Sequence, residues 1–304
     1  MQEQIFRGIY GIVLTPFRDD GSVDFQALQK QIDEAAKSKS LAGFVVCGST
    51  GEFTRLTFGE NVTLMRAIAE ANGKRKQLIC GATAGDSQTA TRYIEEITNI
   101  GADGILLAPP YYFKLKDSEI LAYYQEAFSS NEKKIPVVGY NIPQCTNPIS
   151  LDVFEKLLEY DEVKGFKNSW FDLQEITAHL GMIQRQRPDI SYFTGLDGCL
   201  RGVTALGGDG IFSALSYLMP DVMEKIFADV SSKDSESCQF DILDLVRRIN
   251  RFSFPYGYRM FSEIAGKPLG EGREAIPEEE CALAAQSALE MKTLYQKLLQ
   301  YMEE

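Results

Sequence analysis

The sequence contains one histidine and one tryptophan, and its six cysteines are scattered without any C-x-x-C pair. A serine or cysteine hydrolase usually needs a histidine beside its nucleophile. The one histidine, His179, falls inside a predicted helix, where we expect a surface or packing residue. Structural zinc sites need clustered cysteine and histidine ligands. The composition therefore argues against a histidine-dependent nucleophile and against a metal site.

Positive charge and long apolar runs are also scarce. The chain carries 31 Lys and Arg against 43 Asp and Glu, for a formal net charge of -12, so nucleic acid and anionic membrane surfaces would be repelled. No apolar run approaches the length of a membrane span, and residues 1–7 do not resemble a secretory signal. Scattered free thiols are typical of a reducing compartment. We expect a cytoplasmic protein without a nucleic-acid or membrane partner.

The chain does contain a regular alternation of short apolar runs and longer amphipathic segments. Eight runs are predicted strands: 8–15, 42–47, 78–83, 104–108, 135–141, 163–167, 191–194 and 210–213. Helical spacing follows the first six of them, at 25–38, 60–72, 88–100, 117–129, 151–159 and 173–186. A short helical stretch at 198–206 separates the last two strands.

Strand–helix units in this number predict an α/β fold, the closed (β/α)8 or TIM barrel, with additional C-terminal helices. Residues 1–220 would supply the strands and most helices. Residues 221–304 would supply the eighth helix and a helical extension, packed as part of one unit. The alternative is an open doubly wound sheet, but its nucleotide fingerprint needs a glycine-rich turn after the first strand, where this chain has Thr15-Pro16-Phe17.

A barrel of this type carries its active site in the loops after the strands, and here those loops are rich in glycine, hydroxyl groups and phenols. The loop from Gly48 to Gly51 offers free amides and two hydroxyls that could hold a carboxylate. Lys167 ends the sixth strand; a lysine in a partly dry site can lose its proton and attack a carbonyl, although it can also snorkel to solvent. Together these groups suit carbonyl chemistry through a Schiff base.

Six segments carry a resemblance to one enzyme family. They read GIVLTPF at 11–17, GSTGE at 48–52, GADGILLAPPYY at 101–112, YNIP at 140–143, GFK at 165–167 and GGDGIFS at 207–213. By their order and spacing, the chain resembles the dihydrodipicolinate synthase and N-acetylneuraminate lyase family of pyruvate-dependent class I aldolases over nearly its whole length. The resemblance implies catalysis through a covalent imine, with no external cofactor and no metal.

The resemblance also implies roles for individual residues. Lys167 would form an imine with pyruvate or another 2-oxo acid, and Tyr140 would relay protons at the reacting oxygen. Ser49 and Thr50 would hold the substrate carboxylate. Tyr112 resembles a tyrosine that reaches into a neighbouring subunit's site, although it could equally be an interface packing residue. The remaining predicted binding residues are Gly48, Gly51, Ser169, Gly195, Asp197, Asp209 and Ser213. Kinship suggests a homotetramer made of two dimers.

Departures from the family's branches bear on the substrate. The synthase branch usually has an arginine two residues after the YN-x-P motif, where this chain has Cys145. The sialic-acid branch usually has an acidic residue after the aspartate matched by Asp197, where this chain has Gly198.

The residues Asp197, Ser169, Asp209 and Ser213 fit a polyhydroxylated tail better than a second carboxylate. We therefore expect a lyase that cleaves a 2-keto-3-deoxy sugar acid, N-acetylneuraminate-like or shorter, to pyruvate and an aldehyde. The alternatives are 4-hydroxy-tetrahydrodipicolinate (dihydrodipicolinate) synthase, a sugar-acid dehydratase, and a non-enzymatic 2-oxo-acid sensor or scaffold.

Overall fold

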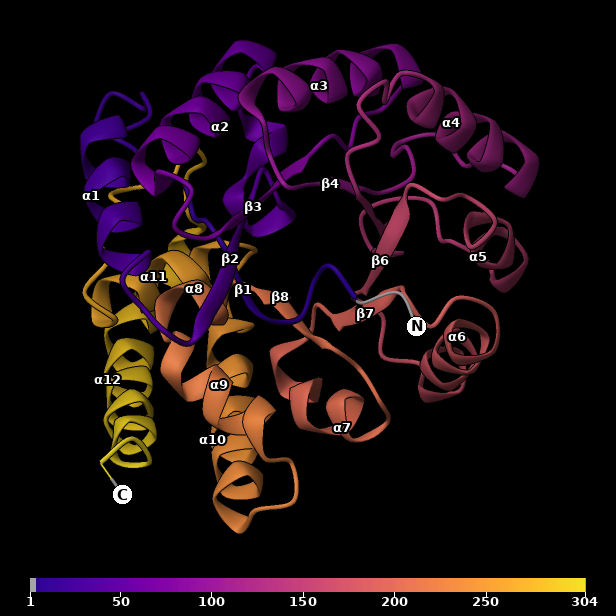
Figure 1. Ribbon diagram of the computed structural model, residues 1–304. Helices are drawn as coiled ribbons and strands as arrows, with labels where there is room; N and C mark the ends of the chain where they lie inside the picture. The colour runs from indigo at the N-terminus through magenta and orange to yellow at the C-terminus, as the bar shows by residue number, and fades with distance from the viewer. Residues whose placement is uncertain (1–3, 304) are drawn as a thin grey trace.

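A computed structural model describes residues 4–303 and shows eight parallel strands closed into a barrel (Figure 1). Each strand pairs with the next one in the sequence, and β1 pairs with β8. The predicted (β/α)8 fold is confirmed. The strands are β1 (Gly8–Ile12), β2 (Leu41–Val46), β3 (Gln77–Gly81), β4 (Gly104–Leu107), β5 (Val137–Asn141), β6 (Val163–Asn168), β7 (Ser191–Thr194) and β8 (Gly210–Ser213).

Helices surround the barrel, and several begin at residues that cap them. Asp24 accepts from the amides of Gln26 and Ala27 before α1, and Thr57 and Glu60 form a capping box at the start of α2. The helices between the strands are α1 (Phe25–Ala35), α2 (Phe58–Asn72), α3 (Ser87–Ile100), α4 (Asp117–Ser129), α5 (Leu151–Leu157), α6 (Leu173–Gln186) and α7 (Leu200–Ala205), with 3-10 turns η1 (Ser49–Gly51), η2 (Phe53–Arg55) and η3 (Asp197–Cys199).

Two apolar layers hold the barrel together. One lies between the strands and the helices, and the other fills the interior, so the barrel is a packed core with no open pore. The interior layer consists of Phe6, Tyr10, Ile12, Val45, Ile79, Leu106, Ala108, Val138, Tyr140, Ile142, Phe193 and Phe212. Because the interior is filled, a ligand site has to lie at an end of the barrel.

His179 on α6 belongs to the outer layer. It is fully buried, and its ring packs against Phe154 and Phe166 at centroid distances of 4.3 and 5.0 Å. Burial lowers its pKa to about 3, so the imidazole is neutral at physiological pH. It is a packing residue.

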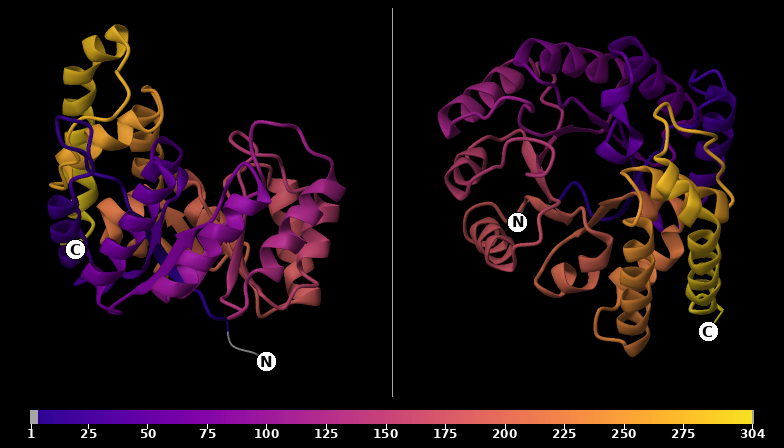
Figure 2. Two further views of the ribbon diagram at one scale, coloured as in Figure 1. Left: turned by 90° about the horizontal axis from the view of Figure 1, so that it is seen from above. Right: turned by 180° about the vertical axis from the view of Figure 1, so that it is seen from behind.

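The chain continues after β8 as a helical extension. It comprises α8 (Ala214–Leu218), α9 (Pro220–Ala228), α10 (Lys233–Ile249), α11 (Tyr256–Ile264) and α12 (Glu278–Gln300). Helices α8 and α9 pack against β1 and β2, while α10 and α11 pack against α12. Figure 2 shows these orange and yellow helices standing to one side of the barrel. The extension is thus anchored to the barrel through its first helices.

Helical spacing at 220–230, 241–252 and 277–302 predicts three helices in this region, so the pattern misses α8 and α11. It also starts the second of the three too late, because α10 begins at Lys233. The buried face of α11 consists of Gly257, Arg259, Phe261 and Ser262. Two of these four buried residues, Arg259 and Ser262, are polar, so the buried positions of this nine-residue helix are not marked by apolar side chains alone.

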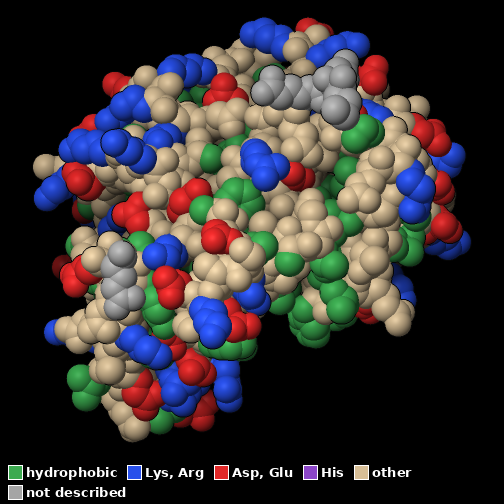
Figure 3. Space-filling view, turned by 60° about the horizontal axis from the view of Figure 1, so that its bottom comes forward, with side chains coloured by type: hydrophobic (Ala, Val, Ile, Leu, Met, Phe, Trp, Pro, Cys, Tyr) green, Lys and Arg blue, Asp and Glu red, His purple; other side chains and the backbone are tan. Residues whose placement is uncertain are grey.

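The surface is strongly charged. Figure 3 shows acidic and basic side chains interspersed over one face of the molecule. Among the helices in residues 4–303, none combines the length and the apolar character needed to cross a membrane.

Candidate active site

Lys167 is held inside the barrel near the end of β6, where its side chain is only 1% exposed. The strand register pairs it with Tyr140 on β5 and Phe193 on β7. Residues paired across adjacent strands point to the same side of the sheet. Accordingly, the Lys167 Nζ atom lies 3.9 Å from the centroid of the Tyr140 ring. The amine is therefore enclosed beside a phenol and does not point into bulk water.

The amine of Lys167 opens onto a cavity of about 330 Å³. The lining draws on several strands and on the extension, as expected for the C-terminal end of a barrel. Eight of the predicted site residues lie in this lining: Ser49, Thr50, Tyr140, Lys167, Ser169, Gly195, Asp197 and Ser213. The structure thus brings together most of the residues that the sequence suggested.

Tyr140 is positioned by bonds between β5 and β6. Its hydroxyl lies 3.2 Å from the Ser169 hydroxyl. The next residue, Asn141, points to the other side of the sheet and donates to Asn168 at 3.1 Å, while its own oxygen accepts from the amide of Ile149. These amide contacts fix the register that places the phenol of Tyr140 beside Lys167.

Gly195 leaves the space that Lys167 and Ser169 occupy. A Cβ atom at this position would overlap the Ser169 hydroxyl and would lie 2.7 Å from Cε of Lys167. Any side chain here would displace the amine, so the position requires glycine for steric reasons.

Asp197 is a buried carboxylate in the same cavity, 4% exposed. The hydroxyl of Tyr258 donates to Oδ2 at 3.4 Å, whereas no donor in residues 4–303 reaches Oδ1. Burial raises the pKa of Asp197 to about 6, an effect that the hydrogen bond from Tyr258 partly offsets. The lining of the cavity therefore includes a buried carboxylate with one oxygen that has no donor in the described residues.

The C-terminal extension contributes groups that the sequence reasoning missed. Tyr258 comes from α11, and Asn250 and Phe254, from the segment between α10 and α11, also line the cavity. Gln144, from the loop after β5, is a further lining residue. Also from α11, Arg259 donates to Glu52 at 2.8 Å, and Glu52 also accepts from Arg55 at 2.6 Å.

Arg259 ties the loop after β2 to the extension. Its guanidinium also donates to the carbonyls of Thr15, Leu269, Gly270 and Glu271. The glutamate of the GSTGE segment is thus a structural anchor, and this anchor places α11 over the mouth of the barrel.

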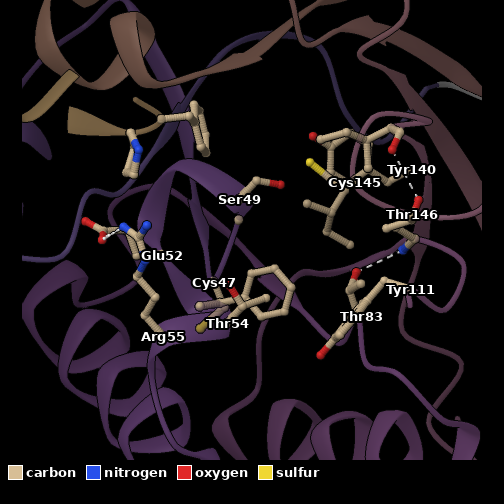
Figure 4. A pocket seen from close by; sticks show the side chains of 17 residues that line it. Cys47, Ser49, Glu52, Thr54, Arg55, Thr83, Tyr111, Tyr140, Cys145 and Thr146 are labelled. Atoms are coloured by element: carbon tan, nitrogen blue, oxygen red, sulfur yellow. Dashed lines mark hydrogen bonds and ion pairs between the residues drawn. The ribbon is translucent and has the colours of Figure 1, made fainter. Parts of the chain in front are cut away.

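A second cavity of about 310 Å³ adjoins the first (Figure 4). Figure 4 shows Glu52 and Arg55 on one side of it and Tyr140, Cys145 and Thr146 on the other. Cys145, the departure from the synthase pattern, lies in this lining. The two cavities share Ser49, Tyr140, Ile142 and Phe254.

Three predicted residues lie around these cavities without lining the one beside Lys167. Gly48 lines the second cavity. Gly51 lines neither; its carbonyl accepts from the Thr15 hydroxyl at 2.7 Å, and a Cβ there would lie 2.8 Å from the Val13 carbonyl oxygen. Tyr112 is 92% exposed and packs edge to face on Phe113. Its predicted role depends on a neighbouring subunit.

The prediction that Asp209 binds substrate is wrong. Asp209 precedes β8, so it lies at the opposite end of the barrel from Lys167. There its carboxylate accepts from the amide of Tyr192 at 2.9 Å and pairs with Arg7 at 3.2 Å. Its polar partners explain its burial, and it has a structural role.

The structure thus has an enclosed lysine, a phenol and hydroxyl groups together at the C-terminal ends of the strands of a closed (β/α)8 barrel. The chain belongs to the dihydrodipicolinate synthetase family, whose model matches residues 5–274. Members of this family are lyases of the class I aldolase type, and this protein is an enzyme of that class.

Individual relatives agree with this assignment. An uncharacterized DapA-like lyase of Pyrococcus abyssi is 34% identical over 235 residues, which cover 75% of this chain and 76% of the relative. A 4-hydroxy-tetrahydrodipicolinate synthase of Methanosphaerula palustris is 28% identical over 291 residues, 94% of this chain and 97% of the relative. The crystal structure of YagE, a prophage protein from E. coli in complex with pyruvate, has a TM-score of 0.84 at 23% identity, covering 97% of this chain and 99% of that one. The structural likeness supports the fold.

Proposed function

We propose that this protein is a Schiff-base-forming, pyruvate-dependent lyase that cleaves a 2-keto-3-deoxy sugar acid to pyruvate and an aldehyde. The observation that carries the proposal is the enclosed amine of Lys167, 3.9 Å from the Tyr140 ring. An amine nucleophile next to a phenol, in a cavity lined by hydroxyl groups, matches the needs of imine catalysis.

The reaction begins when the unprotonated amine of Lys167 attacks the C2 carbonyl of the substrate and water leaves. The protonated imine then withdraws electrons from the neighbouring carbons. Tyr140, directly or through the substrate carboxylate, takes the proton of the C4 hydroxyl as the C3–C4 bond breaks. The bonding electrons form an enamine, and the aldehyde is released. Protonation of C3 and hydrolysis of the imine release pyruvate and restore Lys167.

The loop after β2 would hold the C1 carboxylate of the substrate. Ser49 and Thr50 both line the cavity beside Lys167. Their hydroxyls and the amides of this loop supply a local positive field in a protein whose net charge is negative. An anionic 2-oxo acid can therefore bind despite the acidic surface.

The lining of the cavity favours a hydroxylated tail. Asp197, Ser169 and Ser213 all lie in this lining and offer groups that can hydrogen-bond to hydroxyls. Lys167 is the one lysine or arginine among the described residues that line this cavity, so a second carboxylate would lack a cation there. A sugar acid meets these conditions better than a dicarboxylate does.

A second candidate is 4-hydroxy-tetrahydrodipicolinate synthesis, the activity named for the M. palustris relative. The observation in its favour is Arg55, a cation that lines the adjoining cavity and could meet the carboxylate of an aldehyde substrate. Cys145 stands where the synthase branch usually carries its arginine, which is why we rank this candidate second.

The imine is tested by borohydride reduction in the presence of pyruvate, followed by mass spectrometry. We expect a reduced pyruvate adduct on Lys167, and loss of both the adduct and turnover by at least about 10⁴-fold in Lys167→Ala. Lys164→Ala is the matched control, because Lys164 lies on the same strand but pairs with Asp189 at 2.9 Å. A wild-type protein without the adduct would refute the imine mechanism.

The substrate class is tested by a screen of 2-keto-3-deoxy sugar acids for pyruvate release. Pyruvate with aspartate semialdehyde serves as the opposing pair. Turnover of the opposing pair alone would select the synthase. Formation of a 2,5-dioxo acid product without pyruvate release would select a dehydratase. Binding of pyruvate without turnover of any candidate would select a sensor or scaffold.

The proposed reaction needs no added cofactor and no metal. We expect enzyme treated with EDTA and then dialysed to keep its full rate of pyruvate release. A rate that falls on chelation and returns with a divalent cation would contradict this part of the proposal.

We also propose that the protein forms a homotetramer in which Tyr112 completes the proton relay of a neighbouring subunit. What supports this is the 92% exposure of Tyr112 on the loop after β4, which leaves its hydroxyl accessible to another subunit. Tyr112→Phe should lower kcat without dissociating the assembly. Light scattering that gives a monomer would withdraw this role.

A further inference from the structure

We propose that Phe254, from the C-terminal extension, determines how long a chain the lysine-bound substrate can carry. Its ring separates the two cavities at the mouth of the barrel and confines the substrate to the cavity beside Lys167. The proposal rests on the function proposed above, because it takes Lys167 as the point of attachment.

The position of Phe254 between the cavities follows from the residues that they share. Ser49, Tyr140 and Ile142 belong to the loops and strands at the end of the barrel, whereas Phe254 comes from the segment between α10 and α11. Three of the four residues that line both cavities therefore belong to the barrel, and Phe254 is the one that the extension contributes.

The backbone that carries Phe254 is held in place. The preceding Ser253 donates from its amide and its hydroxyl to the two oxygens of Glu280, at 2.9 and 2.5 Å. Phe252 is buried and packs against Tyr256 at a centroid distance of 5.6 Å. Phe252 and Ser253, the two residues before Phe254, thus anchor this segment to α11 and α12.

The ring of Phe254 is less confined than its backbone. It is 53% exposed, and its contact with an aromatic neighbour is an edge-to-face packing on Tyr258 at 6.1 Å. A large apolar side chain left half-exposed above two cavities, on a fixed segment, is suited to contact a ligand. Its removal should enlarge the space without removing a core side chain.

The two cavities also differ in chemistry. The cavity beside Lys167 offers Gln144, Asp197 and Ser213 to a polar chain. The adjoining one offers mainly apolar groups, among them Leu106, Ala108 and Pro255. With Phe254 in place, a chain attached to Lys167 meets the polar set; without it, a longer apolar chain gains access to the second cavity.

The test is a competition between unbranched 2-oxo acids, from pyruvate to 2-oxooctanoate, for reductive trapping on Lys167. The amine and the ketone condense with loss of water, and borohydride delivers hydride to C2 of the imine to give a stable secondary amine that mass spectrometry counts. We expect the wild type to trap pyruvate and the other short acids of the series and to discriminate against the longest.

In Phe254→Ala, the ratio of 2-oxooctanoate to pyruvate adduct should rise by about tenfold or more, as expected when several methylenes gain a pocket. Phe254→Leu should give an intermediate ratio. Phe240→Ala is the matched control, because Phe240 is 62% exposed on α10 and lines neither cavity among the described residues. Its ratio should equal that of the wild type.

An unchanged ratio in Phe254→Ala, with pyruvate still trapped, would overturn the role of Phe254 and leave the proposed function intact. A rise of equal size in Phe240→Ala would also overturn it, because the effect would then come from general loosening of the extension. A wild-type protein that traps no pyruvate would refute the proposed function, and the role of Phe254 with it.

Discussion

Lys167, Tyr140 and Ser169 stand on two neighbouring strands or directly after them, whereas Tyr258 and Phe254 reach the same cavity from a helical extension that begins after β8. The positions of the first group are fixed by backbone hydrogen bonds between strands. The positions of the second depend on side-chain contacts such as the Arg259–Glu52 pair. The barrel presents the group that reacts, and the extension shapes the space that the substrate must fit.

The variant with the largest expected effect is Arg259→Ala, which tests how the extension is held on the barrel. It would leave Glu52 buried with one fewer partner and remove one donor from each of four backbone carbonyls, so we expect a loss of about 3–5 kcal/mol in the free energy of unfolding. Denaturant titration measures this. The control Arg66→Ala, at a surface pair with Glu96, should cost less than about 1 kcal/mol. Equal losses in the two variants would mean that the Arg259–Glu52 pair stabilises the fold no more than a surface ion pair does.

Gly195→Ala tests the barrel side of the comparison. The new Cβ would push against Lys167 and Ser169, so kcat/KM should fall by about 10²-fold while the protein remains folded. Gly202→Ala is the control, since a Cβ there meets nothing within 4 Å. Full activity in Gly195→Ala would show that the amine tolerates displacement.

Asp197→Asn tests the carboxylate that lines the cavity beside Lys167 and accepts from Tyr258 of the extension. The pKa of Asp197 is about 6 in the folded chain against an ordinary value of 3.8. The ionised carboxylate should accept a substrate hydroxyl best, so kcat/KM for a sugar acid should rise as the pH increases through about 6. In Asp197→Asn this rise should disappear, with a rate about tenfold lower above pH 6. A pH profile shared by both proteins would exclude Asp197 as its source.

The same shift predicts a change in stability. Between pH 4 and pH 6 the folded chain binds a proton at Asp197 that the unfolded chain does not bind. The stabilising contribution of this group to the free energy of unfolding is therefore present at low pH and is lost as the pH rises through about 6. Asp197→Asn should lack this decline in the free energy of unfolding. Unfolding curves at pH 4 and pH 7 measure it for both proteins.

The smallest expected effect is that of Tyr258→Phe. It removes a 3.4 Å hydrogen bond to Asp197 and keeps the ring that packs on Phe254. We expect a three- to tenfold increase in KM for the sugar acid, with little change in kcat. A large fall in kcat would mean that Tyr258 takes part in the chemical step and does not only shape the cavity.

Much of the fold was predictable because the strands are short, apolar and regularly spaced. The site residues at strand ends followed from the same pattern, since the carboxyl ends of parallel strands meet at one end of a barrel. Asp209 was misplaced because it lies next to a strand but before it. In a parallel barrel, a residue just before a strand lies at the opposite end of the barrel from a residue just after a strand.

The contribution of the extension was not predictable in this way. Arg259 is a buried arginine, and its partner Glu52 lies far from it in the sequence. Phe254 and Phe252 occupy similar sequence surroundings, yet one faces the cavities and the other is buried. No periodicity distinguishes them, because contacts with other segments decide which way each ring points.

The eight-strand barrel, the family and the placement of Lys167 near the end of a strand could be predicted from the amino-acid sequence, because strand periodicity and short motifs act locally. The enclosure of the amine, the burial of Asp197 and the position of the extension over the site could not be predicted in this way. Those properties depend on burial and on contacts between distant segments, which exist only once the chain has folded.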